Sequence, residues 1–307
     1  MKNVEDYASV HLGKAGDGTV VNPYVTPDDV DPSLLVGVPR ILNRTQYNIN
    51  EKELPFVGVD AWNAYEFSTL LSNGFPVSGW LKFCYAASSP NIVESKSVKL
   101  YLNSYNMAKL IDNISDLYVI MDMIEHDLSN VVGADVTVGI AVDGDIVNAD
   151  PFRGVFYALE DLCDVESMQF TEFNESSDIL EVVPAPKNIL QSFRSSSLRS
   201  NCRVTNQPDW GDVYIKITGP NTVTPESLLK YIVSMRRENH FHEEICECIY
   251  KRLYDLLKPV DLFVSCLYTR RGGIDINPTR ATYYSDIIQY AYNLTEANIF
   301  CAKSMRQ

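Results

Sequence analysis

The spacing of apolar and polar positions changes period several times along the chain and marks out its regular elements. In the first half, residues 78–86 alternate and predict a strand, and residues 93–102 predict a helix. A stripe at helical spacing from Leu117 to Leu128 predicts a second helix, capped by Ser115 and ended by Gly133. Alternating valine and isoleucine over residues 136–142 then predict another strand.

The second half repeats this order of elements without repeating the sequence. Residues 212–218 predict a strand, and Thr224 with Pro225 marks the start of a helix that reaches Met235. A further helix over residues 242–258 and a strand over residues 261–268 follow. Two units of strand, helix, helix and strand, with helices grouped on one face of an antiparallel sheet, predict the α+β class.

Four segments have weaker patterns. Residues 1–55 are rich in glycine and proline and predict an irregular arm that packs across the following domain. Residues 60–74 carry apolar groups at helical spacing, which predicts a helix ending at Gly74. Asp143 and Gly144 predict a hairpin-type turn. Residues 150–200 are acidic and predict little regular structure.

Composition and charge narrow the function. The 307 residues are 46% hydrophobic with a formal net charge of -14, which indicates a folded protein and excludes a broad nucleic-acid surface. The seven cysteines have no framework spacing, so we expect reduced thiols in the cytoplasm. The polar start of the chain and the absence of long apolar runs predict neither a signal peptide nor a membrane span.

A possible reactive loop precedes the strand at residues 212–218. Cys202 stands seven residues before Asp209, and the turn formers Thr205, Asn206 and Pro208 lie between them. A thiolate is the reactive form of cysteine, and a nearby carboxylic acid can protonate what the thiolate has attacked. Most cysteines are small buried hydrophobic residues, and the segment taken alone favours that interpretation over a reactive thiol.

Three other segments combine binding groups with a structural alternative. Residues 94–101 place serines and lysines at a helix start, which fits a phosphate site or a solvated helix end. Residues 270–273 pair arginines with glycines, which fits an anion site or an exposed turn. Residues 241–244 place His242 and Glu243 at a helix start, where they could bind a heterocycle or stabilise the helix.

A zinc site is a weaker possibility. His242 and Cys246 are four positions apart and could share a metal on one helix face, but Cys248 points away from Cys246 and no second ligand cluster is evident. We therefore expect no metal.

Taken together, these motifs resemble the QueF family of NADPH-dependent 7-cyano-7-deazaguanine reductases, in its long form with two modules. The resemblance extends from Leu12 to Pro278, and four separate segments carry it in the right order. They are residues 94–106, 200–210, 241–243 and 270–278.

The resemblance implies tandem tunnelling-fold (T-fold) modules, each an antiparallel sheet with two helices on one face. Residues 1–150 would form the arm and the module with the NADPH motif, and residues 151–307 the module with the cysteine and aspartate. It also implies a homo-oligomer, expected to be a dimer, with one chemical site built from both modules. The expected partner is a small deazapurine, with no nucleic acid and no membrane.

The resemblance also implies residue roles. Cys202 would attack the nitrile carbon and form a thioimide, and Asp209 would act as general acid. Two NADPH would be used in each turnover. The deazaguanine ring would be held by Val93, Glu94, Ser95, His242 and Glu243. NADPH would be held by Ser95, Lys96, Arg271 and Gly272, with Lys99 and Arg270 as further phosphate contacts.

Two alternatives remain open. A related transferase would keep Cys202 and Asp209 but add ammonia to the nitrile, giving an amidine. The intact segment from Glu94 to Tyr101 favours reduction over this. A non-catalytic purine-binding protein would bind its ligand whether or not Cys202 was alkylated.

Overall fold

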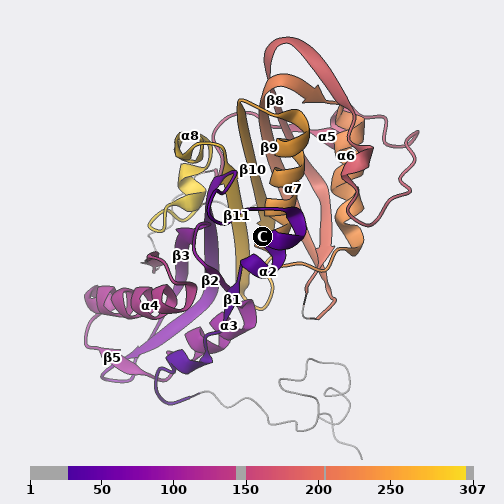
Figure 1. The fold of residues 1–307 in the computed structure, drawn as a ribbon. Helices are drawn as coiled ribbons and strands as arrows, with labels where there is room; N and C mark the ends of the chain where they lie inside the picture. The colour runs from indigo at the N-terminus through magenta and orange to yellow at the C-terminus, as the bar shows by residue number, and fades with distance from the viewer. Residues whose placement is uncertain (1–26, 143–149, 204, 302–307) are drawn as a thin grey trace, which may run out of the picture.

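A single long sheet runs through both halves of the protein (Figure 1). The computed structural model describes residues 27–142, 150–203 and 205–301. The strands follow the order β6-β3-β2-β11-β10-β9-β8-β7, and β5 pairs with β2 outside this path. Their bounds are β2 Val57–Leu71, β3 Pro76–Ala86, β5 Lys109–Ile111, β6 Val136–Ala141, β7 Tyr157–Ala158, β8 Val182–Asn201, β9 Pro208–Val223, β10 Asp261–Tyr268 and β11 Ile274–Ala281. A separate pair joins β1 Gly37–Pro39 to β4 Asn91–Val93.

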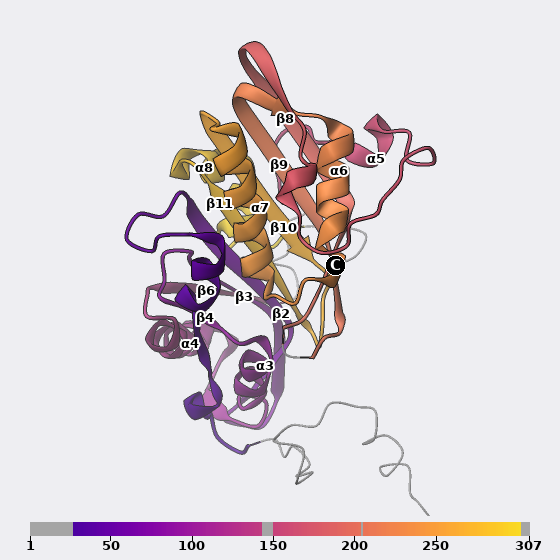
Figure 2. The same cartoon turned by 45° about the vertical axis from the view of Figure 1, so that its right-hand side comes forward.

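Two longer helices cover one face of the sheet in each half (Figures 1 and 2). In the first half, α3 Ser95–Asn103 and α4 Leu117–Val132 bury their apolar stripes against β2, β3 and β6. In the second half, α6 Pro225–Ser234 and α7 His242–Leu257 pack on β9 and β10. Shorter helices are α2 Ile41–Arg44 and α5 Leu159–Leu162. This arrangement confirms the predicted α+β class, with two helices on one face of a mainly antiparallel sheet in each half.

The opposite face of the sheet is partly covered by a helix that was not predicted. In α8 Tyr284–Thr295, Ile287, Ala291 and Leu294 pack against apolar residues of β2, β10 and β11. Lys82, on β3, donates through Nζ to the carbonyl oxygens of Asn293, Glu296 and Ile299 at 2.7–3.1 Å. A buried ammonium group thereby satisfies carbonyls at the end of this helix.

The predicted helix at residues 60–74 is wrong, because this segment is the central strand β2. Its side chains are buried on both faces of the sheet. Trp62 and Ala64 face the helices of the first half, whereas Val59 and Ala61 belong to the apolar cluster beneath α8. A strand covered on both faces carries buried residues at successive positions, so its sequence lacks the alternation that identifies a half-exposed strand.

The expectation of little regular structure before residue 200 is also wrong, since β8 occupies Val182–Asn201. Its register with β9 shifts twice, between Pro184 and Ile189 and between Ser195 and Leu198. Glu160 fills the second irregularity by accepting bonds from the hydroxyls of Ser195 and Ser197. Bulges, serines and prolines interrupt the two-residue alternation of apolar and polar side chains in β8, so the sequence pattern does not identify this strand.

Several local predictions agree with the structure. Thr224 caps α6 by accepting from the Ser227 amide, and Gly133 ends α4 with a left-handed φ of 73°. The predicted strand at residues 212–218 is the middle of the longer β9. Ser115 is not the helix cap, because Asn113 and Asp116 form a capping box there. The predicted turn at Asp143 and Gly144 lies outside the described residues.

The described part of the arm joins the two halves through buried ion pairs. Arg40 bonds Asp60 of β2 at 2.5 Å, and Arg44 bonds Glu247 of α7 at 2.8 Å. Arg280 of β11 completes the network, lying 2.7 Å from Asp60 and 2.9 Å from Glu247. Because every one of these charges has an opposite partner, the network tolerates complete burial.

Removing one member of this network should destabilise the protein strongly. Arg280→Met leaves the buried carboxylates of Asp60 and Glu247 with fewer partners, so we expect a loss of about 3–5 kcal/mol in the free energy of unfolding, measured by urea denaturation. Asp255→Asn, which breaks an exposed Lys251–Asp255 pair on α7, should cost no more than about 0.5 kcal/mol. Equal small losses in both variants would contradict this.

Among the described residues, no helix combines the length and the apolar character that crossing a bilayer requires.

Candidate functional site

Cys202 lies at the tip of the hairpin between β8 and β9. Its amide donates to the carbonyl of Gln207 at 2.8 Å, and its own carbonyl accepts from the Asn206 amide at 2.9 Å. Asn206 adopts a left-handed φ of 55°, a conformation that asparagine tolerates better than most residues. The turn formers identified in the sequence therefore close a tight loop that presents a half-buried thiol.

Asp209 is buried at the start of β9, with 5% of its surface exposed. One carboxylate oxygen accepts from Arg271 at 2.5 Å, and the other lies 3.3 Å from Nε2 of His242. Burial by itself would raise the pKa of Asp209, but the bond to His242 and the charge of Arg271 together lower it below its ordinary value. The His242 ring stacks on Tyr268 with 3.8 Å between centroids, which fixes its plane.

One cleft joins residues from both halves of the chain. Ser95, at the start of α3, shares its wall with Cys202, Asp209, His242 and Arg271. The cleft measures about 450 Å³ including its open mouth. The remaining lining residues are His240, Phe241, Ile274 and Ile276. Five of the predicted site residues therefore converge, although they come from four separate segments.

Glu243 follows His242 on the first turn of α7 and is buried, with 2% of its surface exposed. It is not among the residues that line the cleft. Its Oε1 atom has no hydrogen-bond partner among the described residues. Burial and the nearby charge of Asp60 raise the pKa of Glu243 to about 8, against the opposing effect of Arg40. Buried carboxyl oxygens normally have hydrogen-bond partners, so one that has none among the described residues is a candidate for binding a ligand.

The remaining predicted ring contacts lie at the start of α3. Val93 is buried in β4, with 1% of its surface exposed, directly before the helix. Glu94 is the N-cap of α3, and its carboxylate accepts from the Ser97 amide at 2.8 Å. The structure therefore shows a capping role for Glu94 and does not bring its side chain into the cleft lining.

The predicted cofactor residues form a rim beside the cleft. Lys96 is exposed on α3. Lys99 reaches across to the turn before β11 and donates to the carbonyl of Gly272 at 2.7 Å and to Glu66 at 2.9 Å. Arg270 instead lies over the Tyr65 ring, 3.5 Å from its centroid. This geometry joins the lysine-bearing helix to the arginine–glycine turn.

The turn requires its glycines. Gly272 and Gly273 have left-handed φ values of 58° and 81°. A Cβ atom at Gly273 would lie only 2.4 Å from the side chain of Glu66. Glycine therefore lets the backbone approach the rim closely, which suits contact with a phosphate-bearing cofactor.

The zinc alternative finds no support in the geometry. Within residues 27–142, 150–203 and 205–301, no three His, Cys, Asp or Glu side chains gather as metal ligands. His242 faces Asp209, whereas Cys246 is buried and directs its thiol to the carbonyls of Val264 and Pro278.

Sequence reasoning missed three residues around the cysteine loop. His240 lines the cleft, Tyr268 supports the His242 ring, and Glu244 bonds Arg203. A usable signal was present for two of them, because His240 and Glu244 flank the motif that contains His242. Tyr268 ends an ordinary buried strand, and nothing in its local pattern distinguishes it from the core.

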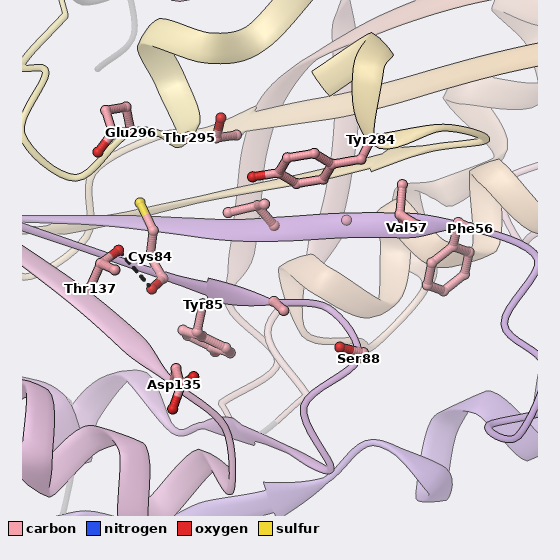
Figure 3. A pocket seen from close by; sticks show the side chains of 13 residues that line it. Phe56, Val57, Cys84, Tyr85, Ser88, Asp135, Thr137, Tyr284, Thr295 and Glu296 are labelled. Carbon is pink, nitrogen blue, oxygen red and sulfur yellow. Dashed lines mark hydrogen bonds between the residues drawn. The ribbon is translucent and has the colours of Figure 1, made fainter. Parts of the chain in front are cut away.

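A second hollow, of about 990 Å³ including its open mouth, lies between the sheet and α8 (Figure 3). Tyr284, Thr295 and Glu296 line one side, and Ser88 and Asp135 lie on the other. Its lining contains none of the residues predicted for catalysis or binding.

Comparison with known proteins gives the family. Residues 26–140 match the family model described as "Nitrile reductase, 7-cyano-7-deazaguanine-reductase N-term", and residues 208–285 match "QueF-like protein". The chain is 38% identical over 262 residues to a Cupriavidus metallidurans protein named NADPH-dependent 7-cyano-7-deazaguanine reductase, covering 85% of this chain and 91% of that one. It is 39% identical over 251 residues to the Dechloromonas aromatica protein of that name, covering 82% and 85%.

One solved structure, the archaeosine synthase QueF-Like in the apo form, covers 31% of this chain and 94% of its own, with 17% identity and a TM-score of 0.27. The identities to the bacterial proteins extend over most of both sequences, and both family models fall where the two halves of the sheet lie. The chain belongs to the QueF family.

Proposed function

We propose that this protein is an NADPH-dependent nitrile reductase that converts 7-cyano-7-deazaguanine to 7-aminomethyl-7-deazaguanine, as the names of its relatives indicate. The observation that carries the proposal is the shared cleft, in which a thiol, a buried carboxylate and the start of the lysine-bearing helix meet. The product is a 7-deazaguanine of the queuosine type. The separation into a cofactor module, residues 1–150, and a cysteine module, residues 151–307, is part of the proposal.

The first step needs a nucleophile and a proton carrier. The Cys202 sulfur adds to the nitrile carbon, one C–N π bond breaks, and the nitrogen receives a proton, which gives a thioimide. Asp209 suits the proton transfer because His242 and Arg271 hold its carboxylate in a fixed position. Its lowered pKa provides a carboxylate that accepts the thiol proton and passes it to the nitrogen.

Reduction then requires two hydrides, and NADPH supplies one hydride each time it is bound. Addition of the first hydride would make the former nitrile carbon tetrahedral. The C–S bond would then break, Cys202 would leave as a thiolate, and an imine would remain. The second hydride and a proton give the primary amine. Ser95, Lys96, Arg271 and Gly272 would hold the cofactor, with Lys99 and Arg270 bracing the rim.

The substrate ring would be held by a second set of residues, separate from most of the proposed cofactor contacts. A deazaguanine presents two neighbouring N–H groups, which a carboxylate accepts as a pair. Glu243 offers an oxygen without a partner among the described residues, and His242 lies beside it. Val93, Glu94 and Ser95 would complete this wall from the first half of the chain.

A single assay tests this function. Purified protein given 7-cyano-7-deazaguanine and NADPH should oxidise two NADPH for each aminomethyl product identified by mass spectrometry. The same reaction with ammonia and without NADPH should leave no amidine, and an amidine product would favour the transferase. Substrate binding that survives alkylation of Cys202, without turnover, would favour a non-catalytic purine-binding protein.

We also propose a cytoplasmic homodimer. None of the seven cysteines forms a disulfide bond in the described part of the chain, which supports a reducing compartment. Tyr283, Tyr284 and Ile288 leave about half of their surfaces exposed on one side of α8, which supports burial of this face in a subunit contact. The net charge of -14 argues against nucleic acid as a direct partner.

A further inference from the structure

A cluster of charged side chains lies against the cysteine loop and has no role in the chemistry proposed above. Arg203 directly follows Cys202. Its Nη1 group donates to both carboxylate oxygens of Glu244, at 2.8 and 3.0 Å. Glu244 belongs to the first turn of α7, so this contact joins the loop to a long helix packed in the core.

Glu244 is itself fixed in place by several donors. Its Oε2 atom accepts from the Phe241 amide at 2.9 Å and lies 3.2 Å from Nδ1 of His240. The other ring nitrogen of His240 lies 2.9 Å from the Tyr47 hydroxyl and 3.3 Å from Glu238. With 9% of its side chain exposed, Glu244 is a nearly buried carboxylate whose position is determined by the surrounding contacts.

The residue before the cysteine is attached to the same segment. The Asn201 amide donates to the Glu238 carbonyl at 2.8 Å, and the Asn201 carbonyl accepts from the His240 amide at 3.1 Å. Both neighbours of Cys202 are therefore bonded to residues 238–244. The backbone bond fixes one side of the thiol, and the Arg203–Glu244 pair fixes the other.

We propose that Glu244 is a positioning residue that acts through Arg203 to hold the Cys202 sulfur in line with the nitrile carbon. A nucleophile must lie about 3–3.5 Å from the carbon with correct alignment, and a misplacement of about 1 Å costs about 10²-fold in rate. Neither side chain needs to touch the substrate for this effect. The effect on rate rests on the proposed function, whereas the effect on the loop does not.

A double-mutant cycle tests the pair. Arg203→Met, Glu244→Gln and the double variant are compared in the rate of thioimide formation without NADPH, followed by absorbance and protein mass. Each single change should slow this step by about 10- to 100-fold. The double variant should be no slower than the slower single variant, because both changes remove the same contact. Substrate affinity, measured in a Cys202→Ala background, should change by less than about threefold.

Hydrogen exchange supplies a readout that needs no substrate. The amides of Cys202 and Asn206 are bonded within the loop, so exchange over residues 202–207 should accelerate in both single variants and no further in the double variant. Lys251→Met is the matched control, since it removes a cation from an ion pair with Asp255 on the same helix. It should change neither the exchange of the loop nor the rate.

The outcomes separate the two proposals. Multiplicative effects of the two single changes, or faster loop exchange with an unchanged thioimide rate, would overturn the positioning role. If the unmodified protein formed no thioimide, the proposed function would fail. The exchange cycle would then still decide whether Glu244 and Arg203 hold the loop.

Discussion

Cys202→Ala should abolish covalent capture of the nitrile and reduce NADPH oxidation by at least about 10³-fold, because none of the other described residues that line the cleft carries a thiol. The protein should still bind substrate, since the proposed ring contacts are untouched. Incubation with 7-cyano-7-deazaguanine, followed by measurement of intact protein mass, checks the adduct directly. Cys202→Ser should also fail, because a hydroxyl at neutral pH is a much weaker nucleophile than a thiol.

The matched control is Cys163→Ala, which removes another partly exposed thiol of the second half. Burial raises the pKa of the Cys163 thiol, and acidic neighbours add to the effect. Its removal should leave the adduct and the rate unchanged. An adduct of normal yield in the Cys202→Ala protein would rule out the proposed nucleophile.

Glu243 should make substrate affinity depend on pH. The pKa of Glu243 is raised to about 8, so the carboxyl group of the free protein is mostly protonated at pH 6. The two N–H groups of the ring require the ionised form, and binding at low pH must therefore release a proton. In the Cys202→Ala background, the dissociation constant should fall up to about tenfold for each unit of pH between 6 and 8.

Glu243→Gln should weaken binding at pH 8 by about 10²-fold or more, because the amide places a donor against a donor of the ring. Its affinity should vary little from pH 6 to pH 8. A dissociation constant that kept its full pH dependence in this variant would exclude Glu243 as the titrating group.

Stability supplies an independent check on the same residue. The folded state raises the pKa of Glu243 above its unfolded value, so folding favours the protonated form. Ionisation therefore removes stability as pH rises from about 4.5 through 8. Relative to the unmodified protein, Glu243→Gln should gain stability over this range in urea denaturation without ligand.

The parts of the fold that the sequence predicts are those whose signals are local. Thr224 acts through its side chain, which accepts from the Ser227 amide, and Gly133 acts through its left-handed backbone. The stripes of α4 and α7 face a single layer. The strand β2 was mistaken for a helix because both of its faces are covered, one of them by a helix distant in sequence. The local sequence pattern of β2 contains no information about α8, which covers one of its faces and lies much later in the chain.

The candidate site shows the same division. The residues Cys202, Asp209 and Arg271 could be selected because their types and motifs suit the chemistry. Their mutual arrangement depends on tertiary contacts that a local motif does not contain. In the structure, Arg271 donates to the carboxylate of Asp209. The Arg203–Glu244 contact joins residues 41 positions apart, and neither residue stands out by itself in the sequence.

The pairing of β2 with β11 has a consequence for biosynthesis. Asn63 lies opposite Asp275, which is 212 positions later. One edge of β2 therefore has no pairing strand until β11 has left the ribosome. During that interval the nascent chain carries an unpaired strand edge, whose backbone N–H and C=O groups can pair with other chains. Slow translation or a truncated message should therefore favour inclusion bodies, and chaperones that shield unpaired strands should raise the yield.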